Sequence, residues 1–516
     1  MSRQSGRTRA PASGAEPCRR AGAQATQPPE SESRDEVGPE ADLPEGWQRL
    51  PLASMVEANA HIQYGILQPG PDTPGGVPYV WPSEIKIQND EIAVGDLRRT
   101  TRAIADQYAR SSLLPGDVLL SIVGSIGKVA LVPPELAGAN ITQSSARLRP
   151  RAGVVDSRYL AWLLRSPHAR RAFDAAELGT GVHRLNIGDL RQMLMPLAPL
   201  PEQKRIVEKI DALLAEVTAA REHLTRVREL LRRLRQSVLA AACSGRLTEE
   251  WRARHAAEAL PADAVLAARR RAWIQAETIR RAREDRSVDE TELAKRYAAP
   301  PGPDARGEAP ESWLWTTLDQ ITLLSGGLTK GQKRSACARL RRVPYLRVAN
   351  VQRGHLDLSV MKEIDATDPE IGELQLQAGD ILLNEGGDID KLGRGWVWEG
   401  QIATCIHQNH VFRARPLAEV VNPYFVSHYA NAVGQDFFFS AGSQTVNLAS
   451  ISLSRVRTLP VPLPPLAEQA EIVHRVGALL ARADAIENAV GTAAIHSERA
   501  SRAILDRALR GKLGAT

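Results

Sequence analysis

The sequence predicts an α+β protein with two globular α/β domains that are related by a pseudo-twofold axis and are each followed by a long helix. The phrase PLAPLPEQKRIVEKI at residues 196–210 returns as PLPPLAEQAEIVHRV at 462–476, with eight of fifteen positions identical. The same displacement of 266 residues recurs through both halves. A heptad pattern of apolar residues follows each phrase, which predicts that the two long helices pack as an antiparallel coiled coil.

Length, charge and cysteine content limit the class of protein. A chain of 516 residues has room for several domains. Its net charge of +6 and pI near 9.2 permit a polyanionic partner without requiring one. The four cysteines lie far apart and lack zinc spacing, so neither a disulfide framework nor a metal site is expected. Without a long apolar run or a secretory signal, we expect a cytoplasmic protein with no membrane contact.

Composition and periodicity divide the chain into six segments. We predict a disordered tail at 1–42, a globular domain at 43–200, a long helix at 201–247, a charged helical linker at 248–308, a second globular domain at 309–465 and a second long helix at 466–516. The tail has almost no large apolar residues to offset the entropy of ordering. The basic residues of the linker are interpreted as a solvated face, with a binding role as the alternative.

Local signals place strands and helices inside each globular domain. The apolar runs VLLSIVG and KVALV in the first half, and DILLN in the second, predict strands. Asp156 and Asn422 precede amphipathic segments and are predicted to be helix N-caps. Gly245 and Gly511 stand where the long helices should end and are predicted to be C-cap glycines.

The long helices carry an apolar seam with alternating steps of four and three residues. Its predicted positions are Ile206, Ile210, Leu213, Val217, Ala220, Leu224, Val227, Leu231, Leu234 and Val238 in the first helix, and Ile472, Val476, Leu479, Ala483, Ile486, Val490, Ala493, Ser497, Ala500 and Ile504 in the second, where only Ser497 breaks the apolar pattern. Such a seam must be covered by another helix, and each helix is the simplest partner for the other.

The repeat keeps its ends and changes in its centre. LPEGW at 43–47 matches APESW at 309–313, but PGDVLLS at 115–121 matches AGDILLN at 378–384 with a displacement of 263. A period this long indicates a duplicated domain, because solenoid repeats have ~20–50 residues. Similar frames around dissimilar centres suggest one scaffold that presents two different surfaces.

With these features the chain resembles the specificity subunits of type I restriction–modification systems. The phrases that carry the resemblance are LPEGW, VPYLRVANVQRGHLDL, PGDVLLSIVGSIGKVALV, AGDILLNEGGDIDKLGRG, PLPPLAEQAEIV and the helix endings SGRL and RGKL. The resemblance covers nearly all of residues 43–513, while the long tail and the linker depart from the compact pattern and leave extra contacts open.

The resemblance implies a function and a set of partners. In that family each globular part is a target recognition domain that reads one half of a split sequence in double-stranded DNA. The long helices act as a spacer and as a docking surface for methyltransferase (modification) subunits, of which two are expected, and restriction subunits join them. The specificity subunit is not catalytic, and S-adenosylmethionine, ATP and Mg²⁺ belong to the partner subunits.

Three short motifs suggest catalysis and are better explained otherwise. NPYF at 422–425 approximates an amino-methyltransferase motif but lacks its second proline, so we interpret Asn422 as an N-cap. PD at 71–72 with EIK at 84–86 fits a loose nuclease pattern that chance explains. GSIGK at 124–128 is too short for a phosphate-binding loop and predicts a tight turn.

DNA contact is predicted for three kinds of residue. Ser125, Lys128, Lys391 and Arg394 lie in predicted turns that suit phosphate contact, with an ordinary hairpin as the alternative. Arg147 and Arg149, with Arg413 and Arg415, follow i, i+2 spacing on strands, where a basic strip and a solvated face are equally open. The base-reading candidates are Asn140, Gln143, Arg184, Gln408 and Asn409, although caps and hairpins also explain them.

Two other functions remain open at this point. A coiled-coil scaffold that binds only protein would share the heptad seam, and salt-dependent binding of the assembled complex to duplex DNA would argue against it. An enzyme with an unrecognised methyltransferase or nuclease site would act on DNA without partners, given S-adenosylmethionine or Mg²⁺.

Overall fold

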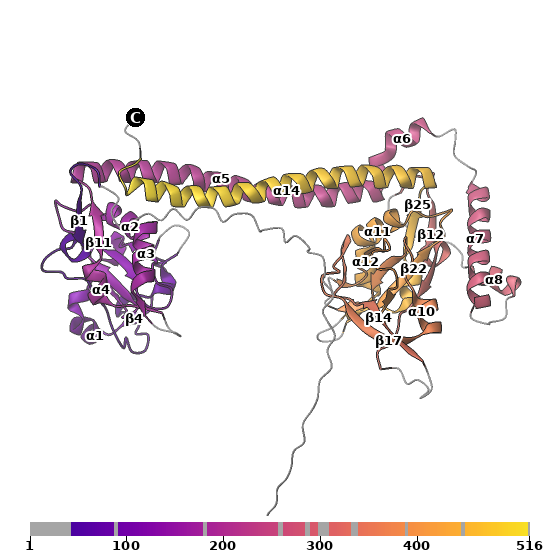
Figure 1. Ribbon diagram of the computed structural model, residues 1–516, viewed down its shortest axis with the longest axis horizontal. Helices are drawn as coiled ribbons and strands as arrows, with labels where there is room; N and C mark the ends of the chain where they lie inside the picture. Colours follow the sequence, from indigo (N-terminus) through magenta and orange to yellow (C-terminus); the bar gives the residue numbers. More distant parts are fainter. Residues whose placement is uncertain are drawn as a thin grey trace, which may run out of the picture. The chain divides into compact units, whose positions relative to one another are not determined.

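The computed structural model describes residues 43–86, 91–178, 183–255, 262–283, 289–297, 309–331, 339–387, 391–444 and 449–513 (Figure 1). It divides into two compact units. Unit 1 comprises Met1–Asp211 with Ile504–Thr516, and unit 2 comprises Ala212–Ala503. The tail at 1–42, which we predicted to be disordered, lies outside the described residues. None of the described helices combines the length and the apolar character that a membrane span requires.

The first domain, in unit 1, is built on small antiparallel and mixed sheets. A four-stranded sheet has the order β2-β8-β5-β6, a three-stranded sheet the order β4-β3-β7, and β1-β11 and β10-β9 form two pairs. The strands are β1 (Gln48–Pro51), β2 (Gln63–Tyr64), β3 (Val77–Val80), β4 (Arg99–Thr100), β5 (Val118–Ser121), β6 (Val129–Leu131), β7 (Asn140–Ile141), β8 (Ser145–Leu148), β9 (Glu177–Leu178), β10 (Arg184–Leu185) and β11 (Leu194–Leu197). The helices are α1 (Arg102–Gln107), α2 (Ser157–Arg165), α3 (Pro167–Ala176) and α4 (Ile187–Gln192), with short 3₁₀ turns η1 (Leu52–Met55), η2 (Pro82–Glu84), η3 (Ala109–Ser111) and η4 (Pro134–Leu136).

The second domain, in unit 2, repeats the four-stranded sheet, the three-stranded sheet and the β1-β11 pair of the first domain, and adds further strands. Its sheets have the orders β13-β22-β18-β20 and β17-β14-β21, with the pair β12-β25, the three-stranded β19-β24-β23 and the pair β15-β16. The strands are β12 (Leu314–Thr317), β13 (Thr322–Ser325), β14 (Leu340–Leu346), β15 (Val351–Gln352), β16 (His355–Leu356), β17 (Lys362–Thr367), β18 (Ile381–Asn384), β19 (Gly386–Gly387), β20 (Gly395–Val397), β21 (Ile406–His407), β22 (Val411–Pro416), β23 (Ser443–Gln444), β24 (Ala449–Ser450) and β25 (Pro460–Leu463). The helices are α9 (Leu318–Ile321), α10 (Asp368–Leu374), α11 (Pro423–Ala432), α12 (Gly434–Ala441) and α13 (Leu453–Arg457).

The shared topology confirms that the sequence repeat is a duplicated domain. In the first domain Leu119 on β5 pairs with Arg147 on β8, and in the second Leu382 on β18 pairs with Arg413 on β22. The predicted N-caps are also confirmed. The Asp156 carboxylate accepts the backbone N–H of Tyr159, and the Asn422 side chain accepts the backbone N–H of Tyr424.

The repeated phrase is explained by a buried glutamine at the start of each long helix. The Gln203 amide accepts the Asp156 N–H (2.8 Å) and donates to the carbonyls of Val154 and Ala198. In unit 2 the amide of Gln469 accepts the Asn422 N–H (2.8 Å) and donates to the carbonyls of two residues that match Val154 and Ala198 in the repeat, namely Val420 and Pro464. Each glutamine is fully buried and joins its long helix to the N-cap of a domain helix. Because each domain needs its own glutamine, the phrase occurs once for each domain.

The two long helices are α5 (Leu200–Cys243) and α14 (Leu466–Ala508). Within unit 2 they contact each other in opposite directions, because Arg221 of α5 bonds Ser497 of α14, while Arg235 further along α5 bonds Asp484 earlier in α14. Most seam residues are buried or half-buried, with Leu231, Val238, Ala483 and Val490 among the buried ones. The seam prediction is wrong at Leu234 and Ile486, which are 43% and 46% exposed, and at Ala220, which is also exposed. The C-cap glycines Gly245 and Gly511 have φ of 75° and 68°, as predicted.

The segment between α5 and the second domain is only partly the solvated linker that we predicted. It contains η5 (Arg246–Thr248), α6 (Glu249–Arg254), α7 (Ala262–Arg283) and α8 (Glu290–Arg296). Trp273 of α7 is buried against the second domain and donates its indole N–H to the carbonyl of Asp319 (2.7 Å). Arg269 and Arg281 are also buried, so the expectation of a solvated basic face is wrong for this side of α7. The reason is that burial of the large apolar side chain of Trp273 stabilises the packing of α7 on the second domain, and this packing also buries Arg269 and Arg281.

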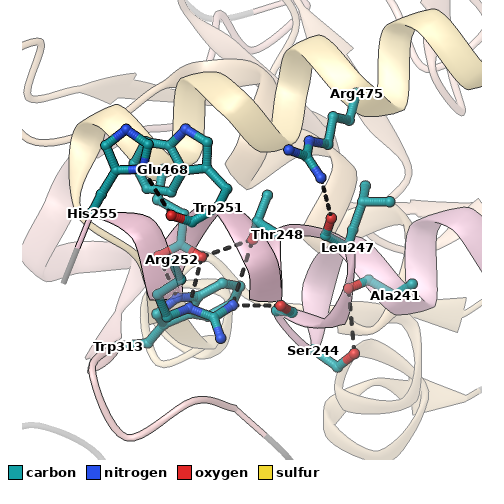
Figure 2. Close-up of polar contacts among 11 residues, drawn as sticks. Ala241, Ser244, Leu247, Thr248, Trp251, Arg252, His255, Trp313, Glu468 and Arg475 are labelled. Carbon is teal, nitrogen blue, oxygen red and sulfur yellow. Dashed lines mark hydrogen bonds and ion pairs between the residues drawn. The ribbon is translucent and has the colours of Figure 1, made fainter.

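A buried carboxylate joins this segment to the start of α14 (Figure 2). Glu468 is 1% exposed and accepts hydrogen bonds from Thr248 Oγ1 (2.7 Å), Arg252 Nε (2.9 Å) and Trp313 Nε1 (3.0 Å). The Arg252 guanidinium also lies over the Trp313 ring. We call these four residues the Glu468 cluster. It ties α6, the entry to the second domain and the first turn of α14 into one packed junction within unit 2.

Candidate nucleic-acid interface

Three loops of the first domain, which adjoin the ends of β5, β8 and β10, are joined by backbone hydrogen bonds. The loop after β5 donates from Ile122 N to the carbonyl of Ser144, in the turn between β7 and β8. It also accepts, through the Ile122 carbonyl, the backbone N–H of Leu185 on β10. These bonds bring the β5–β6 hairpin, the β7–β8 turn and the β9–β10 pair together. We call this arrangement the three-loop site of the first domain.

The second domain builds the same site with the same backbone bonds. Glu385 N donates to the carbonyl of His410 in the β21–β22 turn, and the Glu385 carbonyl accepts the N–H of Ile451, next to β24. In the repeat, Glu385, His410 and Ile451 match the three residues that make the bonds of the first domain. The backbone is therefore conserved between the two sites, whereas the side chains that they carry differ.

A left-handed glycine shapes the hairpin in each three-loop site. Gly127 has φ of 90° and donates its N–H to Ser121 at the end of β5, and Gly393 has φ of 63° and donates its N–H to Asn384 at the end of β18. A Cβ at Gly393 would lie within 2.2 Å of two Phe438 ring carbons. Only glycine therefore fits at Gly393, and in the first domain the positive φ of Gly127 confirms that GSIGK forms a turn between β5 and β6.

Several predicted DNA-contact residues lie at the three-loop sites. Ser125, Gln143 and Arg184 are exposed in the first domain, and Gln408 and Asn409 are half-buried in the turn of the second. The hairpin cations are less available than predicted. The Lys128 ammonium donates to the carbonyl of Pro82 (3.0 Å), and Lys391 and Arg394, both half-buried, also have partners in the protein.

One arginine of each Arg-x-Arg pair forms an internal ion pair. Arg149 donates from Nε and Nη2 to the two oxygens of Asp117, both at 2.8 Å, and these bonds raise the pKa of Arg149. Arg415 makes the same pair with Asp380, both bonds at 2.7 Å. Both aspartates are 1% exposed and belong to the repeated PGD and AGD phrases. Two charge-assisted bonds hold each guanidinium against a buried carboxylate, but both arginine side chains are 24% exposed, so DNA contact by Arg149 and Arg415 stays a prediction.

The other arginine of each pair and Asn140 are buried. Arg147 is 2% exposed and bonds the carbonyl of His61, and Arg413 is 7% exposed and bonds the carbonyls of Glu373 and Gln375. Burial lowers the pKa of Arg147, and it lowers the pKa of Arg413 to about 10. The Asn140 amide is 1% exposed and bonds the Ser111 hydroxyl (2.6 Å). These three side chains cannot reach a groove without local opening, which corrects their prediction as DNA contacts.

The catalytic look-alikes have structural roles. Asp72 accepts the backbone N–H of Arg99 (2.8 Å), and Glu84 accepts that of Trp81 (2.7 Å), so both carboxylates of the nuclease-like pattern are bonded to backbone. Among the described residues, no group of three or more His, Cys, Asp or Glu side chains is arranged to hold a metal ion.

Two histidine–carboxylate pairs at these sites were missed by sequence reasoning. His183 pairs with Glu177 in the first domain, and His410 pairs with Glu385 (2.6 Å) in the second. The members of each pair are far apart in the sequence or separated by a turn, so spacing could not reveal them. The one available signal was that His410 directly follows the candidates Gln408 and Asn409.

Stability of the second domain should depend on pH through His407. The His407 imidazole is fully buried, and burial, followed by the positive charge of Arg413, lowers its pKa to about 4. The unfolded chain binds this proton below ~6.5, so the unfolding free energy should fall by up to ~3 kcal/mol as pH drops from ~6.5 to 4. Replacing His407 with the matching first-domain residue, Ile141, gives H407I, which should lose this part of the dependence in urea denaturation at pH 7 and pH 5. His428, which is half-buried and has a pKa lowered to about 4 by burial, remains as an internal reference. An unchanged pH dependence in H407I would exclude His407 as a source.

The chain carries two domains with matching sheets, each with a matched three-loop site. Residues 44–226 match the family described as type I restriction modification DNA specificity domain. The specificity subunit of the type I restriction enzyme EcoKI from Escherichia coli strain K12 is 26% identical over 490 residues, which cover 92% of this chain and 90% of that relative. Over most of its length the chain is therefore similar to the specificity subunits of type I restriction enzymes.

Two solved structures show the same fold. The HsdS subunit from Thermoanaerobacter tengcongensis is 19% identical, with a TM-score of 0.54, and the match covers 92% of this chain and 99% of that one. A chain from a study of complex assembly and conformational transition of the type I R-M system is 20% identical, with a TM-score of 0.61, and the match covers 92% of this chain and all of the other.

Proposed function

We propose that this chain selects a bipartite DNA target, reads one half-site with each three-loop site, and positions methyltransferase and restriction subunits on it. The observation that carries the proposal is the three-loop site itself, which two domains build from the same backbone bonds but furnish with different side chains. A constant backbone with variable side chains suits two readers of two different sequences.

The side chains at the turn of each site favour base reading. Gln143 and Asn409 occupy the same position in the repeat, directly after Thr142 and Gln408. Both carry an amide, which offers a donor and an acceptor side by side, as base edges require. Ser125 and Arg184 are exposed on the neighbouring loops of the first site, and we propose phosphate contact for both, which for Arg184 replaces the base-reading role predicted from the sequence. Lys128, Lys391 and Arg394 stay as secondary candidates, because each already has a partner in the protein.

The long helices are proposed to pair as an antiparallel coiled coil that relates the domains by a pseudo-twofold axis and sets the distance between the half-sites. The 44 residues of α5 span ~66 Å, more than one ~35 Å turn of DNA, so unread base pairs fit between the half-sites. Opposed contacts between α5 and α14 in unit 2 support this pairing.

The same helices offer a surface to partner subunits. Leu230, Leu234 and Ile486 are 60%, 43% and 46% exposed on α5 and α14. Exposed apolar residues on a helix pair suit the docking of a partner protein. We propose that two modification subunits bind the long helices, one near each helix start, and that a restriction subunit joins them. S-adenosylmethionine, ATP and Mg²⁺ would then be bound by these partners and not by this chain.

Mapping methylated positions made by the assembled complex tests the proposal. We expect a split sequence in which Q143A changes the preference within one half-site only, because Gln143 belongs to one domain. Methylation without sequence preference, or a change in both half-sites, would contradict the assignment of one half-site to each domain.

Arg184 should contribute to affinity without affecting sequence preference. It is exposed on β10 at the three-loop site, and each neutralised phosphate contributes about −0.9 to the log–log slope of affinity against salt. In R184A the slope should shrink by about one, measured by fluorescence anisotropy of the assembled complex between low and physiological salt. The matched control is R158A, which removes the same charge from α2, where Arg158 forms an ion pair with Asp211. An equal loss of slope in both variants would indicate a general charge effect rather than a contact.

A further inference from the structure

In the second three-loop site, three polar side chains form a continuous chain. The Glu385 carboxylate lies 2.6 Å from His410 Nδ1, and His410 Nε2 lies 3.5 Å from Asn409 Nδ2. The imidazole is 54% exposed and the carboxylate 28% exposed. Two backbone elements support the chain, because Glu385 N also donates to the His410 carbonyl (3.0 Å). The His410 ring is therefore tethered to Glu385 through both its side chain and its backbone.

The hydrogen-bond directions follow from the chemistry of the three groups. A carboxylate only accepts, so His410 donates from Nδ1 to Glu385. In the neutral ring Nε2 is then an acceptor, and an amide NH₂ is the group that can donate to it. This leaves Asn409 with one N–H turned toward His410, while its other N–H and its carbonyl oxygen lie on the opposite edge of the same planar amide.

The first domain has the amide but not its support. Gln143 matches Asn409 in the repeat, whereas Ser144 and Ile122 match His410 and Glu385. Gln143 is exposed, while Asn409 is half-buried. The histidine–carboxylate support is thus not needed to build the turn, because the first domain makes the same turn without it. Its presence in the second domain points to a task for the side chain that it holds.

We propose that Asn409 reads an adenine in the half-site of the second domain, and that His410 and Glu385 are positioning residues that fix its amide. This inference rests on the proposed function and names a base class for one of its two sites. With one N–H given to His410, the remaining N–H and the oxygen form a donor–acceptor pair. That pair matches the N7 acceptor and N6 donor of adenine in the major groove.

The same geometry discriminates against guanine. Guanine offers two acceptors, N7 and O6, at the same edge, so the Asn409 oxygen would face O6 without a hydrogen between them. An amide that is free to flip could instead turn its NH₂ toward O6. With a neutral His410 ring, the bond to His410 opposes this flip, because the flipped amide would place its oxygen against the lone pair of Nε2. Glu385 therefore acts on specificity through the tautomer of His410 and the orientation of Asn409.

The test compares preferred half-sites of variants in the assembled complex, by binding to a library of randomised duplexes. N409A should lose ~5- to 100-fold of its preference for adenine at one position of the second half-site. E385L should lose ~5-fold of the preference for adenine at that same position, because His410 Nδ1–H loses the carboxylate that accepts its hydrogen bond. E385Q keeps an acceptor oxygen for Nδ1 and should retain most of the preference. In all three variants the first half-site should be unchanged, which serves as an internal control for folding and assembly.

Two results would overturn the inference. One is an N409A variant with an unaltered second half-site. The other is a loss of preference in E385L and E385Q alike, which would indicate that the charge of Glu385 and not its acceptor matters. If the unsubstituted complex showed no sequence preference in either half-site, the proposed function itself would fail, and this outcome is distinct from the other two.

Discussion

Replacing Arg252 with Ala is expected to lower the unfolding free energy of unit 2 by ~3 kcal/mol, at the lower end of what breaking a buried ion pair costs. Glu468 is 1% exposed and would keep only two neutral donors, Thr248 and Trp313, for a full negative charge. The expected loss of unfolding free energy lies at the low end because the Arg252 side chain is itself 21% exposed and its ion pair is partly screened by solvent. Urea denaturation, followed by hydrogen exchange at the start of α14, measures the change.

Two further variants separate the ion pair from general effects. R254A removes the same side chain from the same helix, where Arg254 is exposed and bonds only its own helix at Glu250, and should change stability little. E468Q removes the charge that Arg252 neutralises, so R252A combined with E468Q should be less destabilised than the sum of the two single variants. Additive effects would show that Arg252 stabilises the junction by packing on Trp313 and not through Glu468.

Inserting four residues into α5 after Ala219 is expected to lengthen the unread gap between the two half-sites of the target. The insertion adds ~6 Å of helix, and DNA rises ~3.4 Å per base pair, so the unread gap should lengthen by one or two base pairs. Both half-sites should stay the same, because no residue of either three-loop site is changed. Affinity for the original target should fall strongly, since only one domain can then engage its half-site at a time.

The control carries the four new residues as substitutions at exposed positions of α5, so that composition changes and length does not. The insertion also shifts the heptad seam locally, so a modest loss of stability is expected in the insertion variant alone. Sequencing of methylated sites distinguishes the outcomes. Altered half-sites with an unaltered gap would show that the helices contact bases directly, and would refute the spacer role.

The sequence by itself determined the duplicated domain and the ends of its main helices. These features depend on local chemistry. Asp156 and Asn422 cap helices because short polar side chains satisfy free N–H groups, and Gly245 and Gly511 end helices because they adopt positive φ. The heptad pattern also revealed the long helices, although it could not show which seam positions stay exposed, as Leu234 does.

Only the tertiary structure decided which polar side chains face inward. The i, i+2 spacing predicted that Arg147, on β8, and Arg149, just after it, share a face, but which face the domain covers depends on elements distant in the sequence, such as the loop that supplies Asp117. The three-loop sites and the Asn409–His410–Glu385 chain likewise require backbone bonds between segments that no local pattern connects. Burial and long-range hydrogen bonds are properties of the packed chain, so residue identity and spacing could name candidates for DNA contact without selecting among them.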